Sequence, residues 1–431
     1  MSQNRKILFC CIAVSLLLCL TQIMGNSMLI LCCLGVYMVL LGWSCVQHRT
    51  LLVLLYFLPW APILKPSPTG YSFYTFGLVL TCCISILRNK LLFKKYTLLS
   101  GIVIMFLTLL SKLLEGYRLE ASYIAFIMMI LVLPSVKEEY RSQNYDFYGV
   151  NLFFSAGIII ATLCAMEFAD FSNIAKYINV DSYRNIIRRS GFYGDPNYYA
   201  AQINAALGGT LLLILKEPNK KKFLVLTAII GFLIYCGALS GSKSFAVVVA
   251  FEVAVWLFNI FRMRRRDGFK LMLIVTTVVL GIYILSSAVF RDLLEVFENR
   301  FSHSNDLNTL TTGRVELWLN YVVELFGSAK IMFLGKGFTN VKVGGEAAHN
   351  TLLQLFFQLG LTGAVFLIYW IVCFLQDGPS TQNEKIPGML AVVIGVYLPW
   401  MAIDMLFFDD FFLLQWYLFV AYYTLQKDNV N

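Results

Sequence analysis

The amino-acid sequence predicts an all-α, polytopic transmembrane protein with about 12–14 spans and one large extracytoplasmic loop. Composition is the first observation behind this prediction: the 431 residues are 59% hydrophobic and only 14% charged, whereas soluble domains are about 45–50% apolar and about 25% charged. A series of long apolar runs is the second. A helix of about 20 apolar residues crosses a bilayer, because it satisfies its own backbone hydrogen bonds where water is absent.

About fourteen such runs follow one another along the chain. Those near 50–64 and 120–134 are the weakest, because the first contains Pro59 and Pro62 and the second is short, so about twelve spans remain without them. The first run is followed at once by another, which favours a retained helix over a cleaved signal. The expected spans are 7–24, 27–46, 50–64, 71–87, 97–114, 120–134, 147–169, 197–215, 222–239, 243–261, 269–290, 350–375, 386–403 and 406–425.

The lysine and arginine residues indicate the orientation, because these residues gather in short cytoplasmic loops. With the N-terminus inside, the basic clusters within 88–95, 216–222 and 262–270 all fall in inner loops. Both termini are then cytoplasmic, and two long segments lie outside, 170–197 and 291–348. The net charge of +9 is therefore a topology signal with some attraction to anionic lipids, and it does not indicate nucleic-acid binding.

The chain is expected to form a single transmembrane domain, 1–431, with its polar chemistry at the outer face. Its 11 cysteines lie in or beside apolar runs, so no disulfide framework is predicted, and no Cys/His cluster indicates a metal. The sequence has no phosphate-binding loop motif, and no cofactor is expected. In the large outer loop, apolar residues recur at helical spacing over 314–326 after Gly313, which predicts an amphipathic helix.

A histidine at the end of this loop is the first candidate for chemistry. His349 and Asn350 are expected to begin a long span, with Gly360 and Gly363 at 11 and 14 residues after the histidine. At about 100° per residue, both glycines fall near the azimuth of His349, which predicts a groove below the imidazole for a lipid tail or a neighbouring helix. An imidazole can serve as a general base near neutral pH. The alternative is an interfacial histidine that caps a helix, with glycines that serve ordinary packing.

Basic side chains accompany this histidine at the outer face. Arg314 begins the amphipathic helix, where backbone N–H groups and a guanidinium fork can hold a phosphate, and the alternative is a salt bridge with Glu316. Lys243 stands at the outer start of a span, where it either meets an anionic ligand or snorkels to lipid headgroups. The first outer loop adds arginines that suit a pyrophosphate or lipid phosphates: Arg184, Arg188 and Arg189.

Acidic residues lie near the C-terminus, between the last two expected spans. Asp404, Asp409 and Asp410 can hydrogen-bond sugar hydroxyls or pair with the arginines, and the alternative is that they are solvated turn residues. Glu252 is a single ionisable group within a span, so it should face a protein partner and not the acyl chains. We expect a structural role for Glu252.

Short motifs of Gly, Asn and basic residues are spread over 190–375. They are Gly191 with Asp195-Pro196-Asn197, Ser242-Lys243, Gly313-Arg314 with Trp318, Leu334-Gly335-Lys336-Gly337, and His349-Asn350 with Gly360 and Gly363. Together these motifs resemble those of the O-antigen ligase and O-antigen polymerase superfamily. The first 150 residues match that superfamily only in being hydrophobic. Where the superfamily usually has arginine this chain has Lys243, which keeps the charge but loses the bidentate fork.

The resemblance implies a GT-C-like fold in the bacterial cytoplasmic membrane and a glycosyltransferase activity that needs no metal. The donor would be an undecaprenyl pyrophosphate-linked oligosaccharide and the acceptor a second glycan, with a chain-length regulator and a flippase of the same pathway as further partners. In this hypothesis His349 takes the acceptor proton, while Arg314 and Lys243 neutralise the pyrophosphate. The remaining residues expected to bind substrate are Arg184, Arg188, Arg189, Asn197, Glu316, Asn350 and Asp404.

Three functions remain open at the level of sequence. A polymerase of capsule, exopolysaccharide or O-antigen repeats is preferred, because that role exists in more kinds of cell envelope. A ligase that moves finished glycan to lipid A core or protein would share the same motifs. A flippase or other transporter of lipid-linked oligosaccharide would also have many spans, but it should place charges along a midplane path and show repeated halves.

Overall fold

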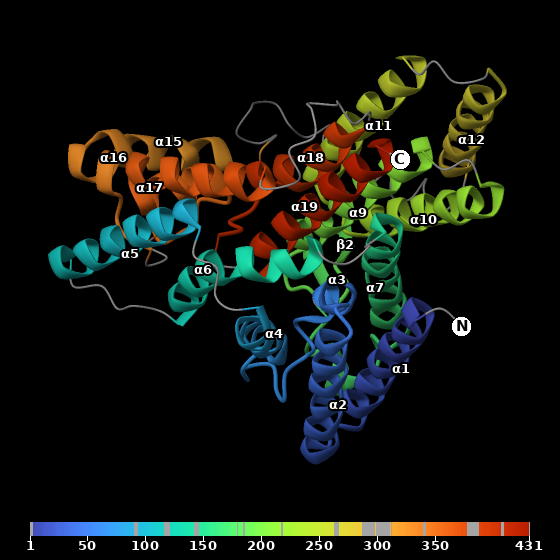
Figure 1. Cartoon of the computed structure of the whole chain (residues 1–431), viewed down its shortest axis with the longest axis horizontal. Helices are drawn as coiled ribbons and strands as arrows, with labels where there is room; N and C mark the ends of the chain where they lie inside the picture. Colours follow the sequence, from blue (N-terminus) through green and yellow to red (C-terminus); the bar gives the residue numbers. More distant parts are fainter. Residues whose placement is uncertain are drawn as a thin grey trace.

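The chain folds almost entirely into α-helices in the computed structural model (Figure 1), as the sequence predicts. One antiparallel hairpin of two short strands accompanies the helices in the described part of the chain. The structure describes residues 3–89, 94–115, 121–141, 146–178, 180–183, 186–216, 219–262, 267–286, 298, 311, 313–338, 342–376, 388–406 and 409–430.

Helices follow one another along the chain, with the hairpin directly before α9. The first half contains α1 (Gln3–Met24), α2 (Ser27–Val46), α3 (Thr50–Phe57), η1 (Leu58–Trp60), α4 (Phe73–Asn89), α5 (Lys95–Glu115), α6 (Ala121–Arg141), α7 (Phe147–Glu167), α8 (Ser172–Ala175), β1 (Val180–Tyr183), β2 (Ile186–Arg189) and α9 (Pro196–Lys216). The second half contains α10 (Lys220–Leu239), α11 (Lys243–Arg262), α12 (Asp267–Ser286), α15 (Arg314–Phe326), α16 (Ala329–Leu334), α17 (Thr351–Gln376), α18 (Met389–Tyr397), η2 (Leu398–Met401) and α19 (Asp409–Val430).

Eight helices in the described residues are long and apolar enough to cross a membrane: α1, α2, α5, α7, α9, α10, α11 and α17. They coincide with eight of the expected spans. Other expected spans form shorter apolar helices, among them Thr50–Trp60 and Met389–Met401. Pro59 and Pro399 each stand at the start of a 3₁₀ turn that ends these two helices, because proline cannot continue an α-helical hydrogen-bond ladder.

Large apolar side chains cover the outside of the helix bundle. Val39 on α2, Leu224 on α10 and Phe258 on α11 are 72%, 70% and 61% exposed. A soluble protein rarely exposes contiguous apolar surface on this scale. The surface of these helices therefore suits lipid, in agreement with a multi-pass membrane protein.

Helix α9 lies at the centre of the bundle and is buried from Tyr198 to Leu215. It packs against α7, α10, α11 and α18. Gly208 permits a close approach between helices, because a Cβ there would lie 2.7 Å from the carbonyl oxygen of Ala391 on α18. The N-terminus of α9, which carries the Asp195-Pro196-Asn197 motif, is therefore held firmly within the fold.

Glu252 on α11 faces this packed centre. Its side chain is fully buried, so the prediction that it avoids the acyl chains is confirmed. Neither carboxyl oxygen has a hydrogen-bond partner among the described residues. The carboxyl instead occupies the space left by Gly208 on α9 and Gly395 on α18.

Helix α17 differs from the continuous helix predicted below His349. The α-helix begins at Thr351, and Gly360 interrupts it with φ 63° and ψ −179°. His349 precedes the helix and has a positive φ of 46°. The predicted alignment of the histidine and the glycines on one helical face is therefore wrong, because no regular helix joins them.

The interruption at Gly360 is filled by the turn that follows α16. The backbone N–H groups of Lys336 and Gly337 donate to the carbonyl oxygens of Phe357 and Gln358, each at 2.9 Å. These are carbonyl groups that the break removes from the helical ladder. The two glycine motifs therefore depend on each other: Gly360 breaks the helix, and the backbone of the Gly335–Gly337 turn binds at the break.

Replacing Gly360 with alanine is expected to destabilise the protein strongly. A Cβ at this position would lie 2.5 Å from the carbonyl carbon of Phe333, and this backbone conformation is nearly exclusive to glycine. We expect a loss of at least about 2 kcal/mol, measured as a lower unfolding temperature of the detergent-solubilised protein. Gly231→Ala on α10 is the control, since its Cβ would meet no atom within 4 Å. Equal stability of the two variants would contradict the docked turn.

Candidate functional site

His349 stands at the N-terminus of α17. The side chain of the next residue, Asn350, caps the helix, because its Oδ1 accepts hydrogen bonds from the backbone N–H groups of Leu352 (3.0 Å) and Leu353 (3.2 Å). Asn350 is buried, whereas the His349 side chain is 41% exposed. The imidazole is therefore the group presented at this helix end, and the predicted contact of Asn350 with substrate stays a prediction.

Asp404 binds the backbone directly before this helix. Its Oδ2 accepts a hydrogen bond from the N–H of His349 (2.8 Å) and its Oδ1 accepts one from the N–H of Asn350 (3.3 Å). Successive backbone N–H groups of this kind form an anion-binding nest. Asp404 is only 6% exposed, so its interpretation as a solvated turn residue is wrong.

The carboxylate of Asp404 also faces the imidazole. Its Oδ2 lies 3.7 Å from Nδ1 of His349, which is an ion-pair distance and longer than a hydrogen bond. Burial raises the pKa of Asp404, while the two backbone N–H groups and the charges of His349 and Arg314 act in the opposite direction. The pair has the arrangement of a base and the acid that orients it.

The backbone of His349 is in the left-handed region, which few residues other than glycine adopt. Histidine tolerates it better than most, together with Asn and Asp. His48, at the end of α2, also has a positive φ, 54°, and its Nε2 lies 3.0 Å from Nη2 of Arg88. The two hydrogen bonds from the backbone N–H groups of His349 and Asn350 to Asp404 stabilise this backbone conformation. Residues with a strained backbone of this kind cluster at functional sites.

Tyr198 on α9 joins Asp404 to the central helix. Its hydroxyl donates to the carbonyl oxygen of Asp404 (2.9 Å) and accepts from the backbone N–H of the same residue (3.1 Å). From α17, the hydroxyl of Thr351 donates to the carbonyl oxygen of Ile403, the residue before Asp404, at 2.6 Å. Sequence reasoning missed Tyr198, although it directly follows the Asp195-Pro196-Asn197 motif.

That motif starts α9 and also binds a second turn. The N–H of Asn197 donates to Oδ1 of Asp195 at 2.7 Å, with Pro196 in the first helical position, where its missing N–H costs nothing. The side-chain oxygen of Asn197 accepts a hydrogen bond of 2.7 Å from the hydroxyl of Ser242. Asn197 therefore fixes the turn that directly precedes Lys243, which is half-buried at the start of α11.

Arg188 lies across the same turn. Its Nε donates to the carbonyl oxygen of Ser240 at 3.0 Å, and its side chain is 8% exposed. Gly241 has a positive φ of 55°, and a Cβ there would come within 3.3 Å of Cγ of Arg188. The glycine of the Ser-Gly-Ser-Lys segment therefore serves both the turn and the close approach of the arginine.

Arg314 is half-buried at the first position of α15, after Gly313 with φ 83°. The bounds of α15 are those predicted for the amphipathic helix. Burial lowers the pKa of Arg314 and the charge of Arg188 acts in the same direction, while the carboxylates of Asp195 and Asp404 raise it. Arg314 is thus within electrostatic reach of all three residues.

Two hydrogen bonds fix α15 relative to His349. The indole N–H of Trp318 donates to the backbone carbonyl oxygen of Ala348 (3.0 Å). The hydroxyl of Tyr321 donates to the backbone carbonyl oxygen of Glu346 (2.8 Å). Both acceptors lie in the short segment that leads to the histidine. The tryptophan of the predicted Gly-Arg and Trp motif therefore connects the arginine helix to the candidate base.

The other residues predicted to bind substrate are placed differently. Arg188 and Arg189 are neighbours on β2, and successive side chains of a strand point to opposite faces. Since Arg188 packs on the Ser240 turn, Arg189 faces away from it. Glu316 is exposed on α15, and Arg184 lies outside the described residues.

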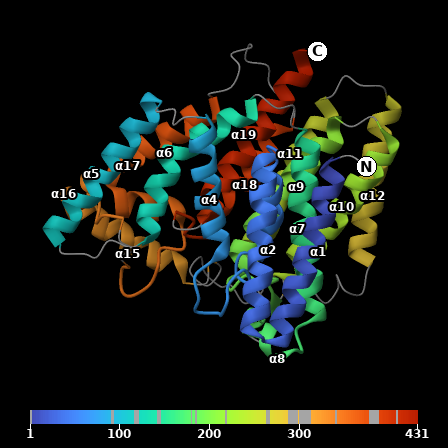
Figure 2. The same ribbon diagram turned by 60° about the horizontal axis from the view of Figure 1, so that its bottom comes forward.

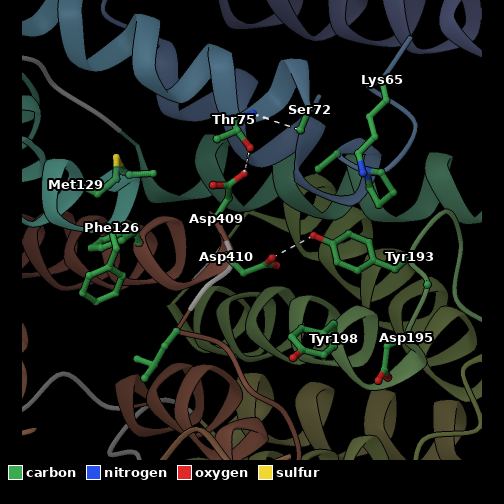
Figure 3. A pocket seen from close by; sticks show the side chains of 16 residues that line it. Lys65, Ser72, Thr75, Phe126, Met129, Tyr193, Asp195, Tyr198, Asp409 and Asp410 are labelled. Atoms are coloured by element: carbon green, nitrogen blue, oxygen red, sulfur yellow. Dashed lines mark hydrogen bonds between the residues drawn. The ribbon is translucent and has the colours of Figure 1, made fainter. Parts of the chain in front are cut away.

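A cavity of about 550 Å³ adjoins this cluster. Asp195 and Tyr198 line it from α9 and the preceding loop, and Asp409 and Asp410 line it from α19 (Figure 3). Asp410 is 1% exposed. Like Asp404, it is therefore not a solvated turn residue, which was the alternative interpretation of these acidic residues. Within the described ranges, no group of three or more His, Cys, Asp and Glu side chains is arranged to hold a metal ion.

No protein-family model matches the chain, and a search of curated proteins returns no match. The functional inference for this chain therefore depends on its motifs and on the geometry described above.

Proposed function

We propose that this protein is a membrane glycosyltransferase of the O-antigen ligase and polymerase kind, with a GT-C-like fold. It joins undecaprenyl pyrophosphate-linked glycans at the outer face of the bacterial cytoplasmic membrane, as a polymerase of repeat units. One observation carries the proposal. His349 and Asp404, 55 residues apart in the chain, lie 3.7 Å apart through Nδ1 and Oδ2, and the charges of Asp404 and Arg188 both act on Arg314.

The exposed imidazole of His349 supplies the base in this proposal. The hydroxyl oxygen of the acceptor sugar attacks the anomeric carbon of the donor sugar, and its proton passes to Nε2 of His349. The bond between the anomeric carbon and the pyrophosphate oxygen breaks, and the electron pair leaves with undecaprenyl pyrophosphate. A positioned base of this type contributes about 10²–10⁴-fold to a rate.

Asp404 acts through the histidine. A carboxylate beside Nδ1 favours the tautomer with its proton on that nitrogen, which leaves Nε2 free to accept the acceptor proton. It also stabilises the imidazolium that forms. Because the same carboxylate accepts the two backbone hydrogen bonds, the position of the imidazole and the position of its counter-charge are coupled.

Arg314 and Arg188 supply positive charge for the leaving group. A pyrophosphate gains charge as the glycosidic bond breaks, and fixed cationic donors stabilise that charge in the transition state. The carbonyl of Ser240 fixes the guanidinium of Arg188 through Nε, and α15 fixes Arg314. Lys243, next to Ser242 in the turn on which Arg188 packs, adds a further cation.

The arrangement of the chain ends supports the expected orientation. In Figure 2 the C-terminus lies at one end of the bundle and α8, from the segment 170–197, lies at the opposite end. With the C-terminus in the cytoplasm, as the distribution of basic residues predicts, α8 is on the outer side. The hairpin of β1 and β2 and the Asp195-Pro196-Asn197 motif follow α8 in the same segment.

Reconstitution tests the proposed function. The purified protein in proteoliposomes, given undecaprenyl pyrophosphate-linked repeat units from its own cell and no nucleotide sugar, is expected to lengthen the glycan and to release undecaprenyl pyrophosphate. Transfer only to lipid A core or to protein would identify a ligase and correct the acceptor. Absence of transfer to any of these acceptors by the folded protein would overturn the proposal.

A further inference from the structure

The cavity beside the candidate catalytic cluster has an apolar side and a polar side (Figure 3). Phe126 and Met129 from α6 and Phe412 from α19 form the apolar side. Its volume of about 550 Å³ falls within the range of about 300–1,000 Å³ that is usual for small-molecule sites. Aromatic rings beside hydrogen-bonding groups suit a molecule with both C–H faces and hydroxyl groups, such as a sugar ring.

Two carboxylates on the polar side are held in fixed positions. Asp410 accepts hydrogen bonds from the hydroxyl of Tyr193 (3.0 Å) and from the amide of Gln202 (2.6 Å). Asp409 accepts one from the hydroxyl of Thr75 at 2.8 Å through Oδ2. Its other oxygen, Oδ1, has no hydrogen-bond partner among the described residues, and Asp409 lines the cavity. Asp409 is therefore an acceptor already oriented for a ligand.

Charge separates this cavity from the basic cluster. Asp195, Asp409 and Asp410 line the cavity with Lys65 as the basic side chain among its lining residues, so the cavity repels anions. Arg188 and Arg314 do not line the cavity, and the charge of Asp195 acts on Arg314. A pyrophosphate is favoured at the arginines, and a neutral or amino-bearing sugar is favoured in the cavity.

The wall of the cavity also supports the candidate base. Tyr198 lines the cavity, and its hydroxyl binds the backbone of Asp404, whose carboxylate faces His349. Leu406, two residues after Asp404, lines the cavity as well, and its N–H donates to Oε1 of Gln354 on α17 at 3.4 Å. A ligand in the cavity is thus one layer of side chains away from the groups that hold the imidazole.

We infer that this cavity is the subsite for the acceptor sugar next to the one that attacks, and that it selects a sugar without negative charge. The inference rests on the proposed glycosyltransferase function and assigns to it a substrate class. Asp409 accepts hydrogen bonds from sugar hydroxyl or amino groups, Phe126 and Phe412 contact the ring, and the arginine cluster keeps the donor pyrophosphate outside the cavity.

Steady-state kinetics test this subsite with two distinct substrates. The donor is the lipid-linked repeat unit of the source cell, and the acceptor is the same oligosaccharide released from its carrier, which cannot act as donor. Asp409→Asn keeps the shape and removes the charge, so the KM for the acceptor is expected to rise about 10-fold or more, while the KM for the donor changes less than about twofold. Ala125→Leu, which fills the cavity from α6, is expected to raise the KM for the acceptor in the same way.

Asp170→Asn is the control, because it removes one carboxylate from an exposed position after α7. An unchanged acceptor KM in both folded cavity variants would overturn the subsite, as would a rise in the donor KM alone. A wild-type protein that accepts oligosaccharides with a uronic acid next to the attacking sugar as well as neutral ones would overturn the charge selection. Inactivity of the wild type towards every acceptor would refute the proposed function itself, and the subsite with it.

Discussion

Replacing His349 with asparagine is expected to lower kcat by about 10²–10⁴-fold while the protein stays folded. Asparagine tolerates the left-handed backbone that His349 adopts, with φ 46°. The hydrogen bonds to Asp404 come from backbone N–H groups, so they persist in the variant. The change therefore removes the proton acceptor and little else. The measurement is single-turnover transfer in proteoliposomes, with the unfolding temperature as a check on structure.

His48→Asn provides a matched control for this substitution. His48 also has a positive φ, 54°, but it lies after α2 beside Arg88. We expect its replacement to leave kcat within about twofold of the wild type, because no substrate step is assigned to that end of α2. Wild-type transfer by a folded His349→Asn variant would remove the general base from the mechanism.

Replacing Arg314 is expected to have the second largest effect. Removing one preorganised donor to a developing negative charge costs about 10²–10³-fold in kcat, so Arg314→Ala should lose activity on that scale. Arg314→Lys keeps the charge but not the planar fork, and it should recover part of the loss. The measurement is the release of undecaprenyl pyrophosphate at saturating donor.

The control for charge alone is Lys330→Ala, at an exposed position on the neighbouring helix α16. It should leave the rate near that of the wild type, because it removes one cation without touching the cluster of Arg188, Asp195 and Asp404. Equal rates for Arg314→Ala and Arg314→Lys would show that position 314 does not stabilise the leaving group through its charge.

Local signals in the sequence were sufficient for elements that local forces determine. Gly313 followed by apolar residues at helical spacing predicted α15 with its observed bounds, Arg314–Phe326. The long apolar runs predicted the eight long helices. Both features depend on residues within a few turns of each other, and such patterns are visible along a single chain.

Contacts between segments that are distant in the chain could not be predicted from the sequence. Nothing near Asp404 in the chain indicates that its carboxylate binds the backbone before α17, 54 and 55 residues away. Tyr198, which connects Asp404 to α9 across 206 residues, was missed for the same reason. A buried acceptor and a solvated turn residue have the same local sequence, and only the tertiary contact distinguishes them.

The break in α17 shows a different limit. The run 350–375 is mostly apolar and contains no charged residue, so it predicts one helix, and Gly360 alone is compatible with that. The backbone of the turn Gly335–Gly337 is what makes the interruption favourable, through its two hydrogen bonds to Phe357 and Gln358. The motif glycines therefore act as a pair, and neither can be interpreted without the other.

Isotope labelling of the donor tests the central claim most directly. A lipid-linked repeat unit is prepared with ¹⁸O in the oxygen that bridges the anomeric carbon and the pyrophosphate, and the products of the wild-type protein in proteoliposomes are analysed by mass spectrometry. The proposed mechanism predicts that all of the label remains in the released undecaprenyl pyrophosphate and that the new linkage contains the oxygen of the acceptor. Label in the lengthened glycan, or no release of undecaprenyl pyrophosphate, would contradict it.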